Sequence, residues 1–370
     1  MAFMKGYAQT GVINPRKNEK VNWTIWGFAF GYFAFYVPYS ATAKALSKGL
    51  FDGMQQGLRG FSILPLSVAA SVMMMIAFLW ITGWWRDATR TQVLGFSMPH
   101  PTRYTFASGV CTSLIIATTT LAYTFDGVSI VFVMLLLRGG VLSIAPIVDR
   151  LSQRRTNWYS WLGLGLSFLA LLIAFSERGG YEITVLCAID VTVYILSYFT
   201  RLRVMSSRAK SNDPKTTRRY FVEEQLVAGP FLLLVLGAIA LLGQGAIVEQ
   251  LRWGFTGIWD SSVVGIVALV GIFSQGTGIC GTLIFLDKRE NTYCVPVNRC
   301  SSILAGLCAS YALYAVFDMP APSAYKLAGA CCILLAILSL TVLPAFLRRK
   351  GAPQSTVRST ETKPRPLGAG

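Results

Sequence analysis

Two arginines lie deep inside apolar runs of the sequence. Arg138 lies within the run 132–142, and Arg299 lies within the run 295–303. If these runs form membrane helices, Arg138 is about 16 Å from the entry of its helix, near the middle of a hydrocarbon core about 30 Å thick. A charge at that depth costs at least about 2.5 kcal/mol, so each guanidinium must face the protein interior and meet an anion or water.

Guanidinium groups bind carboxylates and phosphates through paired hydrogen bonds and remain charged. An alternative to a bound anion is an internal ion pair, for which Asp190 is the only carboxylate at comparable depth. Asp190 shares a helical face with Tyr194 and Ser197, which follow it by four and seven residues. Because two deep cations then face one deep anion, we expect at least one arginine to meet an anionic ligand.

Other polar side chains accompany these residues. Tyr32, Tyr36 and Tyr39 share one face of the first apolar run, where they suit either a sugar or ring ligand or plain packing. The run 271–278 is polar and rich in glycine, which is typical of a broken helix lining a cavity or of a close helix–helix contact. The candidate substrate-binding residues are Arg138, Arg299, Asp190, Tyr194, Tyr36, Gln275 and Asn298.

The sequence gives no sign of catalytic, metal or redox chemistry. The eight cysteines form no CxxC pair, and the only histidine, His100, lies between two prolines. No cluster of carboxylates or histidines is found at one end of the apolar runs, and no Walker motif is present. We therefore expect no enzyme activity, no metal, no cofactor and no ATP-driven pumping.

The elements that position these side chains are ten apolar runs of about 20 residues. The chain has 370 residues, of which 54% are hydrophobic and 14% are charged, whereas soluble domains carry about 25% charged residues. These runs predict an all-α integral membrane protein with ten transmembrane helices. The expected spans are 23–43, 61–85, 104–124, 127–148, 158–176, 182–202, 220–242, 262–286, 292–316 and 325–347.

The basic residues predict the orientation. With the N-terminus in the cytoplasm, the cytoplasmic segments hold 25 lysines and arginines and the outer segments hold six. We therefore expect a multi-pass protein with both termini cytoplasmic, in the cell (inner) membrane if bacterial and otherwise in a plasma or organelle membrane. The net charge of +16 reflects this topology rather than nucleic-acid binding.

An internal repeat is suggested by the two arginines. A shift of 161 residues places Arg138 on Arg299, Asp126 on Asp287 and Ser113 on Ser274. Ten spans divide into five and five, and an odd number inverts the second half. The expected division is a cytoplasmic segment 1–21, a first half 22–180, a second half 181–347 and a disordered cytoplasmic tail 348–370.

Over residues 22–347 the chain resembles the drug/metabolite transporter superfamily, which includes EamA-type permeases, nucleotide-sugar transporters and plastid phosphate translocators. The local features that carry the resemblance are Leu121-Ala122-Tyr123, Leu136-Leu137-Arg138, Pro146 and the stretch from Thr292 to Gly306. The resemblance implies two inverted five-helix repeats and alternating access around a central cavity. It also implies that Arg138 and Arg299 take the role of phosphate-binding basic residues.

The leading hypothesis is a secondary transporter of a small polar, anionic metabolite: an organic acid, an amino acid, a sugar phosphate or a nucleotide-sugar. Asp190 is then a ligand for a basic group or the carrier of a coupling proton. The alternatives are a lipid or polyprenyl-phosphate flippase and a multidrug exporter. The expected partners are a small-molecule substrate and the lipid bilayer, with a homodimer left open and nucleic acid excluded.

Overall fold

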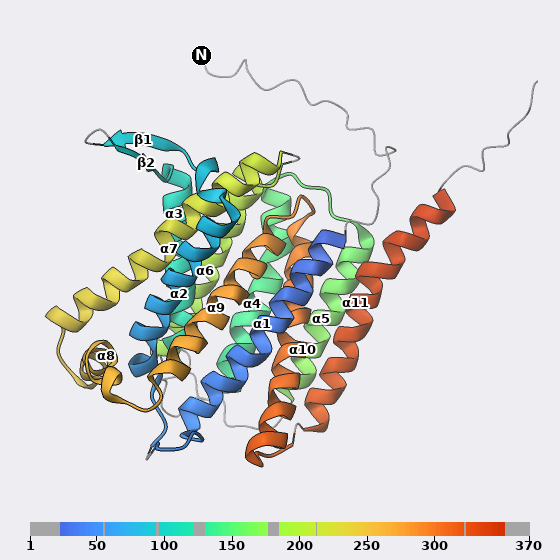
Figure 1. Ribbon diagram of the computed structural model, residues 1–370. Coiled ribbons are helices and arrows are strands. Elements are labelled where there is room, and N and C mark those ends of the chain that lie inside the picture. Colours follow the sequence, from blue (N-terminus) through green and yellow to red (C-terminus); the bar gives the residue numbers. More distant parts are fainter. Residues whose placement is uncertain are drawn as a thin grey trace, which may run out of the picture.

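The described part of the chain consists of α helices that run side by side (Figure 1). The computed structural model describes residues 23–54, 56–93, 96–121, 130–176, 185–211, 213–321 and 323–351. The helices within them are α1 (Trp23–Lys48), α2 (Gly60–Thr82), α3 (Arg103–Leu121), α4 (Ile130–Leu151), α5 (Trp158–Phe175), α6 (Val185–Arg208), α7 (Pro214–Leu242), α8 (Ala246–Phe255), α9 (Val264–Phe285), α10 (Asn291–Phe317) and α11 (Ala324–Gly351).

Each of the ten expected spans falls on one of these helices, and the prediction of an all-α fold is confirmed. Four helices, α2, α7, α9 and α10, are long and apolar enough to cross a bilayer. The expected N-terminal segment 1–21 and residues 352–370 of the expected tail lie outside the described residues, while α11 continues to Gly351. Leu241, Leu242, Leu334 and Leu338 are among the apolar side chains exposed on α7 and α11, as in proteins that contact lipid.

The segments expected to be loops contain further elements. Two single 3-10 turns, Trp84–Asp87 and Gly257–Asp260, and an antiparallel hairpin of β1 (Arg90–Val93) and β2 (Phe96–Pro99) occur there. The short helix α8 also lies in an expected loop, where it buries Leu251 in a cluster with residues of α2 and α7. Its ten residues are too few for a span, so the search for apolar runs missed it.

Helix α7 begins earlier than expected because its N-terminus is capped. Asp213 accepts hydrogen bonds from the backbone amides of Lys215 and Thr216, and Pro214 occupies the first helical turn. The Thr216 hydroxyl also donates a hydrogen bond to Asp213. This bond most of all, together with those of the two amides, lowers the pKa of the Asp213 carboxyl below its ordinary value. Since α7 starts at 214 rather than 220, Glu224 lies about 15 Å inside the helix instead of at its end.

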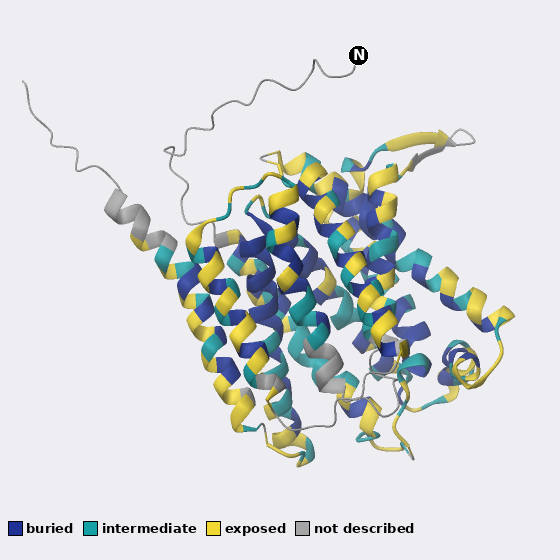
Figure 2. Ribbon diagram, turned by 180° about the vertical axis from the view of Figure 1, so that it is seen from behind, coloured by how far each residue is buried: buried dark blue, intermediate teal, exposed yellow. Residues whose placement is uncertain are grey.

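Helices from the two halves of the chain are interleaved. Helix α1 packs on α9 and α10, and α6 packs on α3 and α4. Helix α2 also packs on α9, and α7 packs on α3, while α2 meets α7, α4 meets α10 and α5 meets α11. Buried residues concentrate at the centre of this arrangement and exposed residues follow the outer helices (Figure 2). The large core cluster joins residues of α1, α4, α6, α9 and α10, including Ile25, Leu142, Leu202 and Ile284.

The glycine-rich run of α9 is a close helix–helix contact and not a helix break, because α9 is continuous from Val264 to Phe285. A Cβ atom added to Gly271 would overlap the carbonyl oxygen of Ser67 and lie 2.9 Å from the Cβ of Ala70 on α2. The Ser71 hydroxyl donates a 2.8 Å hydrogen bond to the Gly271 carbonyl. The contact therefore depends on the absence of a side chain at this position.

We predict that Gly271→Ala destabilises the protein by about 1–3 kcal/mol, because the added methyl group forces α9 away from α2. The matched control is Gly265→Ala on the same helix, where nothing lies within 4 Å of an added Cβ. Thermal unfolding in detergent should give a lower Tm for Gly271→Ala alone. Equal melting temperatures for the two variants would contradict the close contact.

Candidate functional site

Arg299 lies on α10, about 12 Å along the helix from its start at Asn291. The residue is 5% exposed. Its Nη2 atom donates a long hydrogen bond of 3.5 Å to the Tyr194 hydroxyl, and its Cζ atom lies 5.2 Å from the centre of the Tyr198 ring. The buried Nε atom has no hydrogen-bond partner. Tyrosines of α6 thus surround this guanidinium, and none of the ion pairs among the described residues includes it.

Arg138 lies on α4 and is half-buried. Its Nη2 atom donates a 3.1 Å hydrogen bond to the Tyr36 hydroxyl on α1. The Tyr36 ring stacks on Tyr32, one turn earlier, with ring centres 5.5 Å apart. Tyr32 is close enough to interact electrostatically with both Arg138 and Arg299. The structure therefore brings the two arginines around one group of tyrosines.

We call this group the tyrosine–arginine cluster, and it consists of Tyr32, Tyr36, Tyr194, Tyr198, Arg138 and Arg299. The tyrosines come in two pairs with the same spacing of four residues, one pair on α1 and one on α6. The rings of Tyr194 and Tyr198 have centres 4.8 Å apart. Each pair supplies one hydroxyl to one arginine, so the cluster consists of two sets, each with two tyrosines and one arginine.

The structure places Asn298 beside this cluster, and no contact described for Gln275 joins it to the cluster. Asn298 is buried, and its Nδ2 atom and the Tyr32 ring both lie against Gly281 of α9. Gln275 is half-buried on the same helix, and the contact described for its side chain is with Gly278. Of the expected binding residues, Arg138, Arg299, Tyr36, Tyr194 and Asn298 are therefore brought together.

Asp190 does not form the ion pair considered from the sequence. The residue is 3% exposed on α6, one turn before Tyr194. Neither carboxylate oxygen has a hydrogen-bond partner, and no described lysine or arginine forms a salt bridge with it. The arginines are bonded to tyrosine hydroxyls instead.

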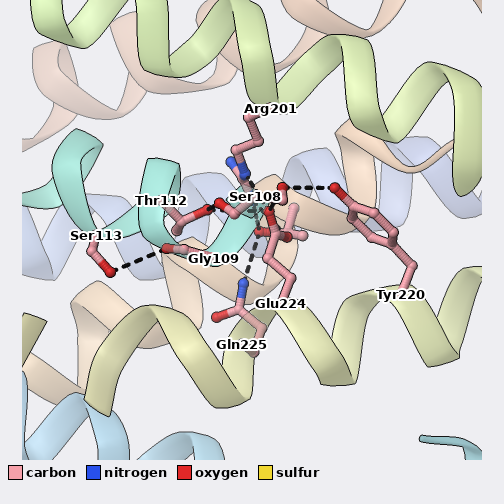
Figure 3. A network of polar contacts seen from close by, with 9 residues as sticks. Ser108, Gly109, Thr112, Ser113, Arg201, Tyr220, Glu224 and Gln225 are labelled. Carbon is pink, nitrogen blue, oxygen red and sulfur yellow. Dashed lines mark hydrogen bonds and ion pairs between the residues drawn. The ribbon is translucent and has the colours of Figure 1, made fainter. Parts of the chain in front are cut away.

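A third buried arginine was missed because Arg201 was counted with the cytoplasmic loop residues. In the structure Arg201 lies inside α6, and its guanidinium meets the Glu224 carboxylate with N–O distances of 2.7 and 3.1 Å (Figure 3). Arg201 also donates a 2.9 Å hydrogen bond to Thr282 of α9. The sequence did hold a signal, since Arg201 continues the helical face of Asp190, Tyr194 and Ser197 at the next regular position.

Hydroxyl groups complete the shell around Glu224. Ser108 and Thr112 of α3 donate to its Oε1 atom at 2.6 and 3.1 Å, and Tyr220 donates to Ser108 (Figure 3). The network therefore joins α3, α6, α7 and α9 through one buried ion pair. A buried pair with this many hydrogen bonds is a structural clamp between helices.

A second polar network lies where α4 ends and α10 begins. Asp149 accepts hydrogen bonds from the backbone amides of Asn291 and Thr292 and from both of their side chains, at 2.7–2.8 Å. Glu290 accepts from Ser160 of α5 at 2.6 Å. Arg154 donates to three backbone carbonyls there. Burial lowers the pKa of its guanidinium, although the negative charge of Asp149 acts in the opposite direction. These bonds cap α10 and tie it to α4 and α5.

We predict that Arg201→Met lowers the free energy of unfolding by about 3–5 kcal/mol, because it leaves the Glu224 charge buried without a counterion. Adding Glu224→Gln removes that charge, so the double variant should recover part of the lost stability. Arg203→Met, on the exposed side of the same helix, is the matched control and should leave the free energy of unfolding nearly unchanged. Denaturation in detergent checks the cycle, and strictly additive losses would show that the two residues are not coupled.

Neither a protein-family model nor a curated protein matches this chain. Among solved structures, the chain is similar to one described only as "Crystal structure of protein", with a TM-score of 0.53 and 11% sequence identity. The match covers 88% of this chain and 98% of that chain. Similarity at this level of identity shows a shared helical fold alone.

Proposed function

We propose that the protein is a secondary transporter that carries a small anionic metabolite across a membrane by alternating access. The observation that carries this proposal is the environment of Arg299. Its guanidinium is buried, touches tyrosines, has an unpartnered Nε atom and lies in none of the ion pairs among the described residues.

Neutral hydroxyl groups accept hydrogen bonds from a guanidinium but do not neutralise its charge. Burying an ion costs several kcal/mol even after the protein relaxes, and the attraction of an opposite charge is what offsets that cost. A carboxylate or phosphate suits this position because it accepts two parallel hydrogen bonds from the planar fork. The Nε atom of Arg299 is a donor that such an anion would engage.

The aromatic side chains around the arginines favour a substrate with a flat or apolar body. The two tyrosine pairs present ring faces next to the guanidinium groups. Asn298 adds an amide at the same place. We therefore propose an organic acid, an amino acid, a sugar phosphate or a nucleotide-sugar as substrate, held by Arg138, Arg299 and Asn298.

The proposal includes ten membrane crossings, two inverted halves (22–180 and 181–347) and cytoplasmic termini. The packing supports this symmetry, because exchanging α1–α5 for α6, α7, α9, α10 and α11 preserves the main helix pairs. The pair α1 and α9 becomes α6 and α3, α1 and α10 becomes α6 and α4, and α2 and α9 becomes α7 and α3. The pairs α2–α7, α4–α10 and α5–α11 map onto themselves.

The tyrosine–arginine cluster follows the same exchange. Arg138 bonds to Tyr36 within the first half, and Arg299 bonds to Tyr194 within the second. Inverted halves around a central ligand are typical of secondary transporters. On these grounds we propose that the chain belongs to the drug/metabolite transporter superfamily.

We predict that Arg299→Ala lowers substrate uptake by about 30-fold or more, since losing a buried charged partner of a ligand costs about 2–5 kcal/mol. Arg299→Lys keeps the positive charge but loses the planar pair of donors, so its uptake should lie between that of the wild type and that of Arg299→Ala. Arg138→Ala should also lower uptake strongly, while Arg150→Ala, exposed in the last turn of α4, should not.

The measurement is counterflow in proteoliposomes with labelled organic acids, amino acids, sugar phosphates and nucleotide-sugars. Circular dichroism melting curves establish that each variant is folded. Full transport by folded Arg299→Ala and Arg138→Ala would remove the binding assignment. Counterflow of cationic aromatic compounds alone, or movement of labelled lipid alone, would replace the proposed substrate class.

A further inference from the structure

Asp190 is a buried carboxyl group without a partner. Both of its oxygens are inaccessible and accept no hydrogen bond, and the residue is 3% exposed. This differs from the other buried carboxylates of the described residues. Asp149 accepts four hydrogen bonds, and Glu224 is paired with Arg201.

The charged and titratable groups near Asp190 are all engaged elsewhere or neutral. On α6 itself, the thiol of Cys187 is the electrostatic neighbour that the structure gives it, and Arg201 lies about 16 Å further along the helix with Glu224. On α4, which packs against α6, Arg138 is bonded to Tyr36, and Asp149 and Arg150 lie at the far end of the helix.

The other elements give the same result. On α3, the Cys111 side chain lies near Arg201 and Glu224, and Arg103 and Tyr104 lie at the start of the helix. On α10, Arg299 is bonded to Tyr194, one turn from Asp190. No group of three potential metal ligands occurs among the described residues, and a metal cation would need several oxygen ligands.

An ionised carboxylate in this position would lack both a counterion and hydrogen bonds, whereas the protonated form carries no charge to desolvate. We propose that Asp190 is a proton-binding site that holds its proton in this conformation and couples proton movement to transport. The coupling rests on the proposed anion transport, and the protonation does not. Release of the proton from the carboxyl oxygen to water requires a conformation in which water reaches Asp190.

Electrostatic attraction between the two bound ions gives the direction of coupling. A proton on Asp190 removes a negative charge near Arg299 and so strengthens anion binding, and by linkage a bound anion strengthens proton binding. Arg138 keeps the same charge in every state and does not change this coupling. A proton carried together with a monoanion transfers no net charge. The protein therefore acts as a proton–anion symporter.

The first test is infrared spectroscopy of the full-length protein in lipid nanodiscs at neutral pH. A protonated carboxyl group gives a C=O stretching band that is separate from the carboxylate bands and shifts in D₂O. We expect this band in the wild type and its loss in Asp190→Asn. The matched control Asp149→Asn removes a buried carboxylate that accepts four hydrogen bonds and should keep the band.

Isotope labelling of the aspartate side-chain carboxyl carbon in the wild type gives the same answer without a variant, because the band must then shift. An unshifted band, or an identical band in folded Asp190→Asn, overturns the protonation of Asp190. This arm needs no substrate, so its failure is distinct from failure of the anion-transport proposal.

The second test imposes a gradient of about one pH unit, alkaline inside, across proteoliposomes with the same labelled anion panel. Electroneutral symport should give about tenfold accumulation of the anion inside vesicles with the wild type, because at equilibrium the anion gradient equals the proton gradient. Asp190→Asn should lose gradient-driven accumulation, and any counterflow that it retains should not respond to the pH gradient. Wild-type accumulation by this variant, or none by the wild type despite active counterflow, overturns the coupling.

Discussion

Charge placed inside an apolar helical bundle must be compensated within the bundle, because lipid offers neither counterions nor hydrogen bonds. The described interior solves this problem in two ways. Arg201 receives a full carboxylate from Glu224 and lies in a shell of hydroxyl groups. Arg299 receives only tyrosines. The first solution fixes helices to one another, and the second leaves a positive charge that a ligand can satisfy.

These two solutions lie along one face of α6. Asp190, Tyr194 and Arg201 follow at helical spacing, and Tyr198 stands next to both Arg299 and Arg201. A shift of α6 against α10 would change the contacts of Arg299, while the clamp at Glu224 ties α6 to α3, α7 and α9. The clamp therefore holds these four helices together.

The fold was predictable where apolar length decides it. Ten runs of about 20 residues gave ten helices in the right places, because the hydrophobic pattern alone specifies a long buried helix. The start of α7 was missed although Asp213 and Pro214 form a recognisable N-terminal signal. Helix α8 was missed because ten residues of mixed polarity do not differ from a loop in an apolar scan.

The tyrosine–arginine cluster was predictable in part, because its two arginines, Tyr32, Tyr36 and Tyr194 were singled out and Tyr198 was not. Arg138, Arg299 and the tyrosines stand out as polar residues in apolar runs, but which tyrosine bonds to which arginine depends on helix packing. Arg201 was assigned to the following loop because it lies next to the end of the expected span 182–202, whereas α6 continues to Arg208. Its partner Glu224 was likewise assigned to a helix end, so the ion pair could not be found from sequence depth alone.

The separation of Asp190 from Arg299 is itself informative. Asp190 lies one turn before Tyr194 on α6, and Arg299 of α10 bonds to the Tyr194 hydroxyl, yet the carboxyl group bonds to nothing described. A direct ion pair would stabilise a single closed state and leave neither charge available. Because the two groups are not paired with each other, the proposed proton and anion positions can each bind their own partner. The energetic link between the two positions is then the attraction between a bound proton and a bound anion, so that each strengthens binding of the other.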